Sequence, residues 1–81
     1  MKFRRMTAEE LIDSYTRGER NFAGIKLEGF PRSFNGMDLS NSNFIGTIWY
    51  ADLVGTNFTN CLFNGADLAE SDCTNAIFRN A

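Results

Sequence analysis

The stretch from Ala51 to Ala81 decides the fold, and in groups of five it reads ADLVG, TNFTN, CLFNG, ADLAE, SDCTN, AIFRN and A. Each complete group begins with a small residue, has Leu, Phe or Cys at its third position and ends in Gly, Asn or Glu. A helix repeats its apolar residues at spacings of three and four, and a half-buried strand alternates, so neither explains a period of five. A fixed short period indicates a solenoid of stacked repeats.

Two of these groups carry a family resemblance. Ala51-Asp52-Leu53-Val54-Gly55 and Ala66-Asp67-Leu68-Ala69-Glu70 resemble the A(D/N)LXX motif of the pentapeptide-repeat family. The motif is short, but six consecutive copies make a strong signal. The resemblance implies an all-β solenoid, a right-handed quadrilateral β-helix in which four pentapeptides form one coil. It also implies that the third residue of each repeat, and the small residue two before it, point inward.

The repeats extend backwards to Arg20, with two interruptions. Two extra residues fall within 30–32, where Pro31 cannot donate to a ladder and therefore suits a corner or bulge. One residue is missing after Trp49, which leaves Thr47–Tyr50 as a four-residue face. We therefore predict an N-terminal leader and capping helix over residues 1–19 and a β-helix of about three coils over residues 20–81. The predicted core centres are Phe22, Leu27, Phe34, Leu39, Phe44, Trp49, Leu53, Phe58, Phe63, Leu68, Cys73 and Phe78.

Twelve centres at four per coil predict four columns of stacked side chains. The columns are Phe22, Phe44 and Phe63; Leu27, Trp49 and Leu68; Phe34, Leu53 and Cys73; and Leu39, Phe58 and Phe78. The first position is small in every repeat from Ser42 onward, because a large side chain there would collide with the inward Phe or Leu. Gly and Asn recur at the fifth position, where a corner requires a positive φ. Asn35-Gly36 and Asn64-Gly65 are also hairpin signals, but the period of five continues through both.

A short helix is predicted before the repeats. Thr7 and Glu10 form a capping box, Met6 and Leu11 occupy the hydrophobic-staple positions, and Gly18 suits the C′ position. The helix should therefore run from Ala8 to Arg17. Ten residues are too few for an independent helix, so we expect a cap that covers an apolar end and a strand edge of the first coil. A partner-binding or membrane-surface helix is the alternative.

Composition limits the classes of function. The 81 residues have a net charge of −2 and no histidine, and the first twenty residues contain no apolar signal-peptide core. The expected location is the cytoplasm. Basic residues concentrate before residue 33, but acidic residues intersperse them, so a nucleic-acid-binding arm is not favoured. No span is apolar and long enough to suggest a membrane helix.

Nothing in the sequence indicates catalysis or a cofactor. Cys61 and Cys73 have no metal-ligand spacing and are best interpreted as buried core thiols, with a disulfide across the coil interior as the alternative. Asp52 and Asp72 should be neighbours in adjacent coils, which could raise one pKa or hold a divalent cation. A solvated acidic face is the simpler interpretation. We therefore predict a protein that is not an enzyme and has no catalytic residue, cofactor or metal.

The predicted function is a structural or protein-interaction module with an unidentified protein partner. The last coil has an open edge, so two chains are expected to meet through their C-terminal coils, and a monomer is the alternative. Candidate interface residues are Ile45, Leu62 and Phe78. Ile45 and Leu62 should point outward on one face, where they would form an apolar patch. The resemblance also raises a second function, because some pentapeptide-repeat proteins mimic duplex DNA and bind type II topoisomerases such as DNA gyrase.

Overall fold

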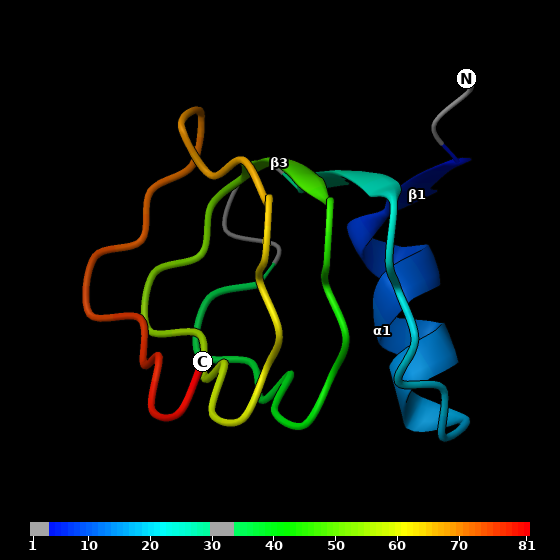
Figure 1. Cartoon of the computed structure of the whole chain (residues 1–81), viewed down its shortest axis with the longest axis horizontal. Helices are drawn as coiled ribbons and strands as arrows, with labels where there is room; N and C mark the ends of the chain where they lie inside the picture. Colours follow the sequence, from blue (N-terminus) through cyan, green and yellow to red (C-terminus); the bar gives the residue numbers. More distant parts are fainter. Residues whose placement is uncertain (1–3, 30–33) are drawn as a thin grey trace.

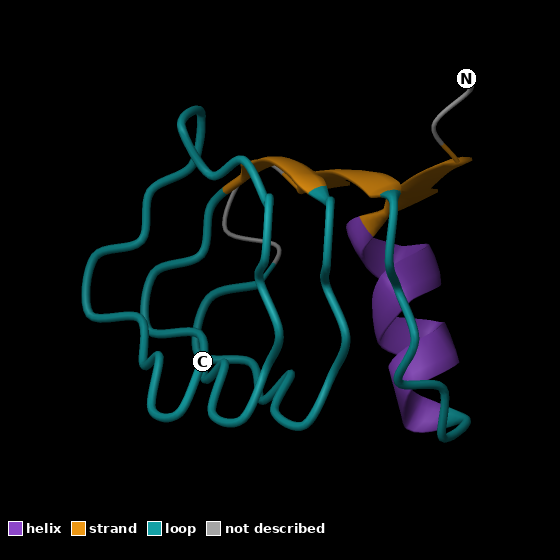
Figure 2. Ribbon diagram, in the orientation of Figure 1, coloured by secondary structure: helices purple, strands orange, loops and turns teal. Residues whose placement is uncertain are grey.

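A computed structural model describes residues 4–29 and 34–81. Its elements in chain order are β1 (Arg4–Thr7), α1 (Ala8–Thr16), β2 (Ile25–Gly29) and β3 (Ile48–Ala51). The three strands form one parallel sheet in the order β1-β2-β3 (Figure 1). Most of the remaining chain is drawn as turns that stack beside one another (Figure 2), with α1 at one end of the stack. No helix among the described residues is long and apolar enough to cross a membrane.

Parallel backbone pairing joins the repeats in the predicted columns. Asn21 pairs with Asn43 and Asn43 with Leu62, while Leu27 pairs with Trp49. The third and fourth columns are fixed by the pairs Asp52↔Asp72, Asp38↔Asn57 and Asn57↔Ile77. We call residues 20–41, as far as they are described, the first layer, 42–60 the second layer and 61–80 the third layer. Because the described pairs agree with every predicted column, the deletion after Trp49 is local and does not shift the repeats that follow.

The corners between columns require a left-handed backbone. Asn and Gly occupy the fifth position there, with φ values from 55° at Asn80 to 70° at Gly24 and Gly55. These residues adopt positive φ at the lowest cost, as the sequence predicted. The corner residues with positive φ are Gly24, Gly36, Asn41, Gly46, Gly55, Asn60, Gly65, Asn75 and Asn80. Turns at Asn35-Gly36 and Asn64-Gly65 belong to this pattern, and the pairing around them is parallel, so neither begins a hairpin.

The interior is filled by the residues at the centres of the repeats. Phe22, Leu27, Phe34, Leu39, Phe44, Trp49, Leu53 and Phe58 are buried. Rings stack along two columns, with centroid distances of 5.5 Å for Phe22–Phe44, 5.6 Å for Phe44–Phe63 and 5.3 Å for Phe58–Phe78. The centres of the third layer are less covered: Phe63, Leu68 and Cys73 are half-buried and Phe78 is 39% exposed. The core therefore ends in an uncovered apolar layer.

Trp49 lies on the shortened face and is accommodated in this interior. Its indole Nε1 donates to Thr47 Oγ1 at 2.8 Å, so the buried polar atom is satisfied. Its ring makes edge contacts with Phe34, Phe44 and Phe58 at centroid distances of 5.7, 5.0 and 5.5 Å. Trp49 is only 1% exposed, so a large side chain is accommodated where the face is an extended strand.

Because the second layer is one residue short after Trp49, the third layer has one residue without a partner in the second layer. Ile48 pairs with Asp67 and Asp52 pairs with Asp72, so the third layer places one more residue between these pairings than the second layer does. A residue without a counterpart must leave the ladder. It does so in the turn at Ala69–Glu70, in the orange loop that stands out from the stack in Figure 1. Glu70 lacks the positive φ that Gly65, Asn75 and Asn80 adopt at the other fifth positions of the third layer.

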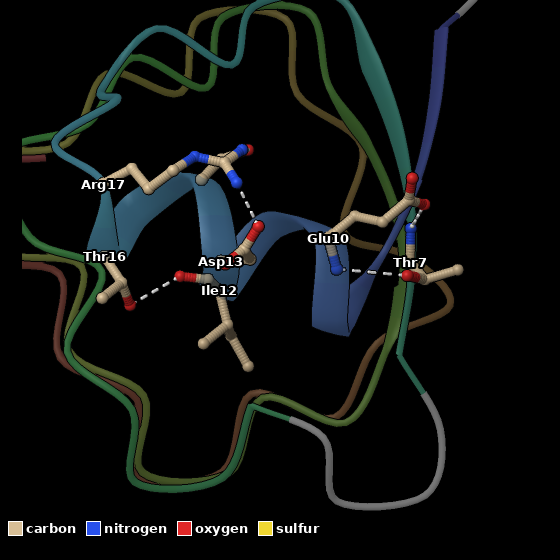
Figure 3. Close-up of polar contacts among 7 residues, drawn as sticks. Thr7, Glu10, Ile12, Asp13, Thr16 and Arg17 are labelled. Atoms are coloured by element: carbon tan, nitrogen blue, oxygen red, sulfur yellow. Dashed lines mark hydrogen bonds and ion pairs between the residues drawn. The ribbon is translucent and has the colours of Figure 1, made fainter.

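Helix α1 begins at the predicted residue, and its capping contacts are drawn in Figure 3. Thr7 Oγ1 accepts from the Glu10 N–H at 3.2 Å, and Glu10 Oε1 accepts from the Thr7 N–H at 2.9 Å, which completes the capping box. At the other end, Gly18 has a φ of 100° and its N–H donates to the Tyr15 carbonyl. The helix ends at Thr16 with Arg17 as its C-cap, one residue earlier than expected. Arg17 also pairs with Asp13 on the exposed side.

One prediction about the N-terminal region is wrong. We expected α1 to cover the strand edge of the first coil, but β1 covers it by pairing in register with β2, with Met6 opposite Leu27. Met6 is 7% exposed and continues the column that Leu27 and Trp49 occupy. The helix instead packs Ala8 and Leu11 into the core. The predicted insertion within 30–32 lies outside the described residues.

Candidate interaction surfaces

The second position of each repeat has a structural role that explains most of its polar side chains. An Asp or Asn at this position accepts, through Oδ1, the backbone N–H of the residue two places later. The distances range from 2.9 to 3.4 Å. The bond satisfies an N–H at the start of the corner and forms an Asx turn. The seven residues that do this are Asn21, Asp38, Asn43, Asp52, Asn57, Asp67 and Asp72.

The paired aspartates therefore belong to the framework. Asp52 and Asp72 are neighbours in adjacent layers, as predicted. Hydrogen bonds from Thr74, first from its hydroxyl and then from its backbone N–H, lower the pKa of the Asp72 carboxyl. The expectation that pairing raises a pKa is thus not met at Asp72. Within residues 4–29 and 34–81, no group of three or more His, Cys, Asp or Glu residues could hold a metal ion.

Neither cysteine has the features of a reactive thiol. Cys61 is buried and its Sγ lies 3.1 Å from the Leu39 carbonyl oxygen, while Cys73 is half-buried in the third layer. Both thiols are free, and burial raises the pKa of each. A raised pKa keeps the thiol protonated at neutral pH and so reduces its nucleophilicity. These positions therefore fit packing and not catalysis.

Two second positions in the third layer lack the Asp or Asn that forms an Asx turn in other repeats. Leu62 and Ile77 stand where an Asp or Asn would accept the corner N–H, and they are 49% and 41% exposed. Neither side chain has an oxygen, so each position gives up that hydrogen bond and places apolar surface in water. Because Leu62 and Ile77 remain about half exposed, burial compensates only partly for the lost hydrogen bond. Ile45, 38% exposed, lies in the same column as Leu62.

Apart from Arg20, the column that contains Ile45 and Leu62 has no charged residue. Its outward segments are residues 21–24, 43–46 and 62–65, which contain Asn, Ala, Ile, Leu and Gly outside the inward Phe residues. We call these three segments the uncharged face. The other columns carry charged residues at outward positions: Lys26, Glu28 and Asp67; Asp52 and Asp72; and Asp38 and Arg79. The side chain of Asn43 donates to Asn21 Oδ1 at 3.3 Å within the uncharged face.

The open end of the third layer is a second candidate surface. Its inward residues Phe63, Leu68, Cys73 and Phe78 are only partly covered. Between the inner layers, the N–H groups of third-position residues donate to the next layer, as in Phe44 to Leu62 at 2.9 Å and Phe58 to Ile77 at 2.7 Å. No described layer follows the third, so its equivalent N–H groups face outward from the end. This surface therefore combines apolar side chains with unpaired edge groups.

A groove at the opposite end is a weaker candidate. It is lined by Arg5, Met6, Thr7, Glu10 and Glu28. Its charged groups already have partners, because Arg5 lies 3.9 Å from Glu28 and Glu10 accepts the Thr7 N–H. These pairs are exposed, and the groove shows no arrangement of acid, base and nucleophile.

Comparison with known families agrees with the repeat pattern. A family model described as pentapeptide repeats, in eight copies, matches residues 50–81. Residues 50–81 thus carry the pentapeptide repeats that the sequence indicated, and repeats of this family imply a solenoid. Among individual curated proteins, none matches this chain.

The structure places the candidate interface residues on two surfaces. Ile45 and Leu62 lie on the uncharged face, and Phe78 lies at the open end of the third layer. Sequence reasoning did not single out Ile77 as an interface candidate. The signal that could have found it is the second-position rule, which requires knowing that the Asp and Asn residues there cap the corners.

Proposed function

We propose that this chain is a non-enzymatic protein-interaction module, built as a right-handed quadrilateral β-helix of about three coils behind an N-terminal cap. The family match and the four columns of parallel pairing support this architecture. The observation that carries the functional part is the apolar end of the third layer, where Phe78 is 39% exposed although its equivalents in the inner layers, Leu39 and Phe58, are fully buried. A surface of this kind is typical of a contact site.

We propose further that the occupant of this end is a second copy of the chain. At the open edge, each repeat presents the carbonyl of its first residue and the N–H of its third residue. Between the inner layers these groups form hydrogen bonds: the Ser42 carbonyl accepts from the Leu62 N–H, and the Phe44 N–H donates to the Leu62 carbonyl. Two identical edges that meet antiparallel can exchange these groups, because each supplies both a donor and an acceptor. The contact would also cover Phe63, Leu68 and Phe78.

The test is the mass in solution, measured by light scattering after gel filtration. The parent chain should have about twice its monomer mass of 9.1 kDa. Phe78→Arg places a charge in the apolar end and should give a monomer, because an unpaired buried charge is costly. Ile45→Arg makes the same kind of change on a side face and should remain a dimer. A monomeric parent chain, or a Phe78→Arg variant that remains dimeric, would refute the end contact.

The electrostatics favour this role over DNA mimicry. A duplex mimic requires dense negative charge, since a DNA duplex carries one charge per about 1.7 Å of its axis. Here the net charge is −2, and the outward segments 21–24, 43–46 and 62–65 of one column carry no charged residue. Partner binding through apolar contacts should therefore change little with added salt, whereas binding by mimicry of phosphates would weaken steeply.

We also propose a cytoplasmic location. The two free cysteines support it, because thiols remain reduced in that compartment. Secretion of the chain with its thiols oxidised would contradict this assignment, and fractionation of cells that express a tagged chain would test it.

A further inference from the structure

Two segments of the chain share the tripeptide Phe-Asn-Gly and fold into the same kind of corner. They are Phe34-Asn35-Gly36 in the first layer and Phe63-Asn64-Gly65 in the third layer. In each segment the glycine has a φ of 69°, and the N–H of the next residue donates to the Phe carbonyl, at 3.0 Å for Met37 and 2.9 Å for Ala66. An Asn that precedes Gly deamidates readily, because glycine has no Cβ to hinder attack by its nitrogen.

Deamidation uses the backbone nitrogen of the glycine as its nucleophile. This nitrogen loses its proton and bonds to Cγ of the Asn, while the bond from Cγ to Nδ2 breaks and ammonia leaves with the proton. The product is a cyclic succinimide. Water then adds to either carbonyl of the ring and opens it to Asp or to isoaspartate. The first step therefore requires a glycine N–H that is not engaged in a hydrogen bond.

The two corners differ at this nitrogen. The Gly36 N–H donates to the Val54 carbonyl in the second layer at 3.0 Å, and the Gly46 N–H likewise donates to the Asn64 carbonyl in the third layer at 2.9 Å. Gly65 lies in the third layer, which no further described layer follows. Within the part of the chain that the structure describes, its N–H has no hydrogen-bond partner. The nucleophile is thus held at Gly36 and free at Gly65.

The surroundings of the two asparagines favour reaction at the same corner. Oδ1 of Asn35 is buried and the residue is only partly exposed, whereas Asn64 is exposed, so water reaches the side chain that it must attack. The bond from Gly46 to the Asn64 carbonyl also withdraws electron density from the Asn64–Gly65 amide. This withdrawal eases loss of the proton from the Gly65 nitrogen.

We propose that Asn64 is a site of spontaneous deamidation in the folded chain, with water as the co-reactant, and that the fold protects Asn35. Either product adds a negative charge to the uncharged face, and isoaspartate also lengthens the main chain by a methylene group. The carbonyl that accepts from Gly46 and the turn bond from Ala66 to Phe63 both lie at this corner. Isoaspartate should therefore loosen the third layer, and the consequence for self-association, unlike the modification itself, rests on the proposed end contact.

The experiment follows the conversion of both asparagines by peptide mapping with tandem mass spectrometry, at mildly alkaline pH. The chain is incubated as a monomer, both as Phe78→Arg and as the parent chain diluted to its monomer mass, because a second copy at the open end would cover the Gly65 N–H. Asn64 should convert about tenfold faster than Asn35, since a hydrogen bond between layers must open before Gly36 can react. In concentrated urea the two rates should be about equal, because the tripeptides are identical.

Equal rates in the folded monomer, faster conversion at Asn35, or no conversion at Asn64 while the unfolded chain reacts would overturn the proposal. Asn64→Gln is the control for the site, since its longer side chain does not form the succinimide, and rapid conversion that persists in this variant would place the reaction elsewhere. The isoaspartate form should also unfold at a lower urea concentration than Asn64→Asp, which carries the charge alone, and equal midpoints would refute the loosened corner. A parent chain that is monomeric at every concentration refutes the end contact but leaves the ratio of the two rates unchanged.

Discussion

Truncation of Phe58 in the middle of the aromatic core should destabilise the chain strongly. Phe58 is fully buried in the second layer. Its ring contacts Phe44, Trp49, Phe63 and Phe78 at centroid distances of 5.9, 5.5, 5.1 and 5.3 Å. Phe58→Ala would leave a cavity in the middle of this cluster, which cannot collapse easily because layers on both sides fix the backbone.

The expected loss is about 3–5 kcal/mol in the free energy of unfolding, as found for buried Phe→Ala changes. We expect a value near the upper end of this range, because each aromatic pair that is lost contributes about 0.5–1.5 kcal/mol to stability beyond the burial of its area. A chain of this size has a total stability of roughly 4–12 kcal/mol, so the variant would be marginal. Phe58→Leu keeps most of the volume and should lose about 1.5 kcal/mol, which keeps it measurable.

Urea denaturation followed by circular dichroism measures these values, and Phe78→Ala is the control. Phe78 contacts only Phe58 and Phe63 among the described rings and is 39% exposed, so its truncation should cost about half as much as that of Phe58. Equal losses at the two positions would show that the third layer is as well covered as the second. A loss below about 1 kcal/mol for Phe58→Ala would refute the stacked aromatic core.

Three further predictions concern the ends, the corners and the carboxylates. Thr7→Ala removes the capping box and should lower the free energy of unfolding by about 1 kcal/mol, measured by urea titration, while Thr7→Ser should not. Gly55→Ala forces a Cβ into a backbone with φ of 70°, 3.7 Å from the Gly36 nitrogen, and should cost about 1–2 kcal/mol in the same assay, whereas Asn60→Gly should cost little. Hydrogen bonds from Ser40 and Thr74 lower the pKa of Asp38 and Asp72, so their contribution to stability is present above the pKa of an unfolded Asp and is lost as pH falls through the folded values. Carboxyl NMR titration should therefore place both pKa values below 3.8, and a value above it at either residue would contradict the hydrogen bonds.

Much of the fold follows from the sequence because its signals are local. The period of five sets the columns, since each repeat makes one face and one corner, and the structure keeps that register from Phe22 to Phe78. The capping box at Thr7 and Glu10 depends on residues three positions apart, so it too could be recognised directly.

Two features could not be predicted because they depend on pairing between distant segments. Strand β1 adds only Met6 to the buried core, and its pairing with β2 uses backbone groups that every sequence has. The bulge at Ala69–Glu70 arises because the layer beneath it is one residue shorter, which no inspection of residues 66–71 alone would show.

The candidate surfaces, too, depend partly on local sequence signals and partly on contacts between distant segments. The sequence by itself determined that Ile45, Leu62 and Phe78 occupy outward or terminal places in a repeat. Only the tertiary structure decided that Leu62 replaces a corner-capping acceptor and that the three segments of its column together present no charge. The physical reason is that the period of five assigns each side chain a direction, whereas exposure and neighbouring charge are set by which residues the stacking brings together.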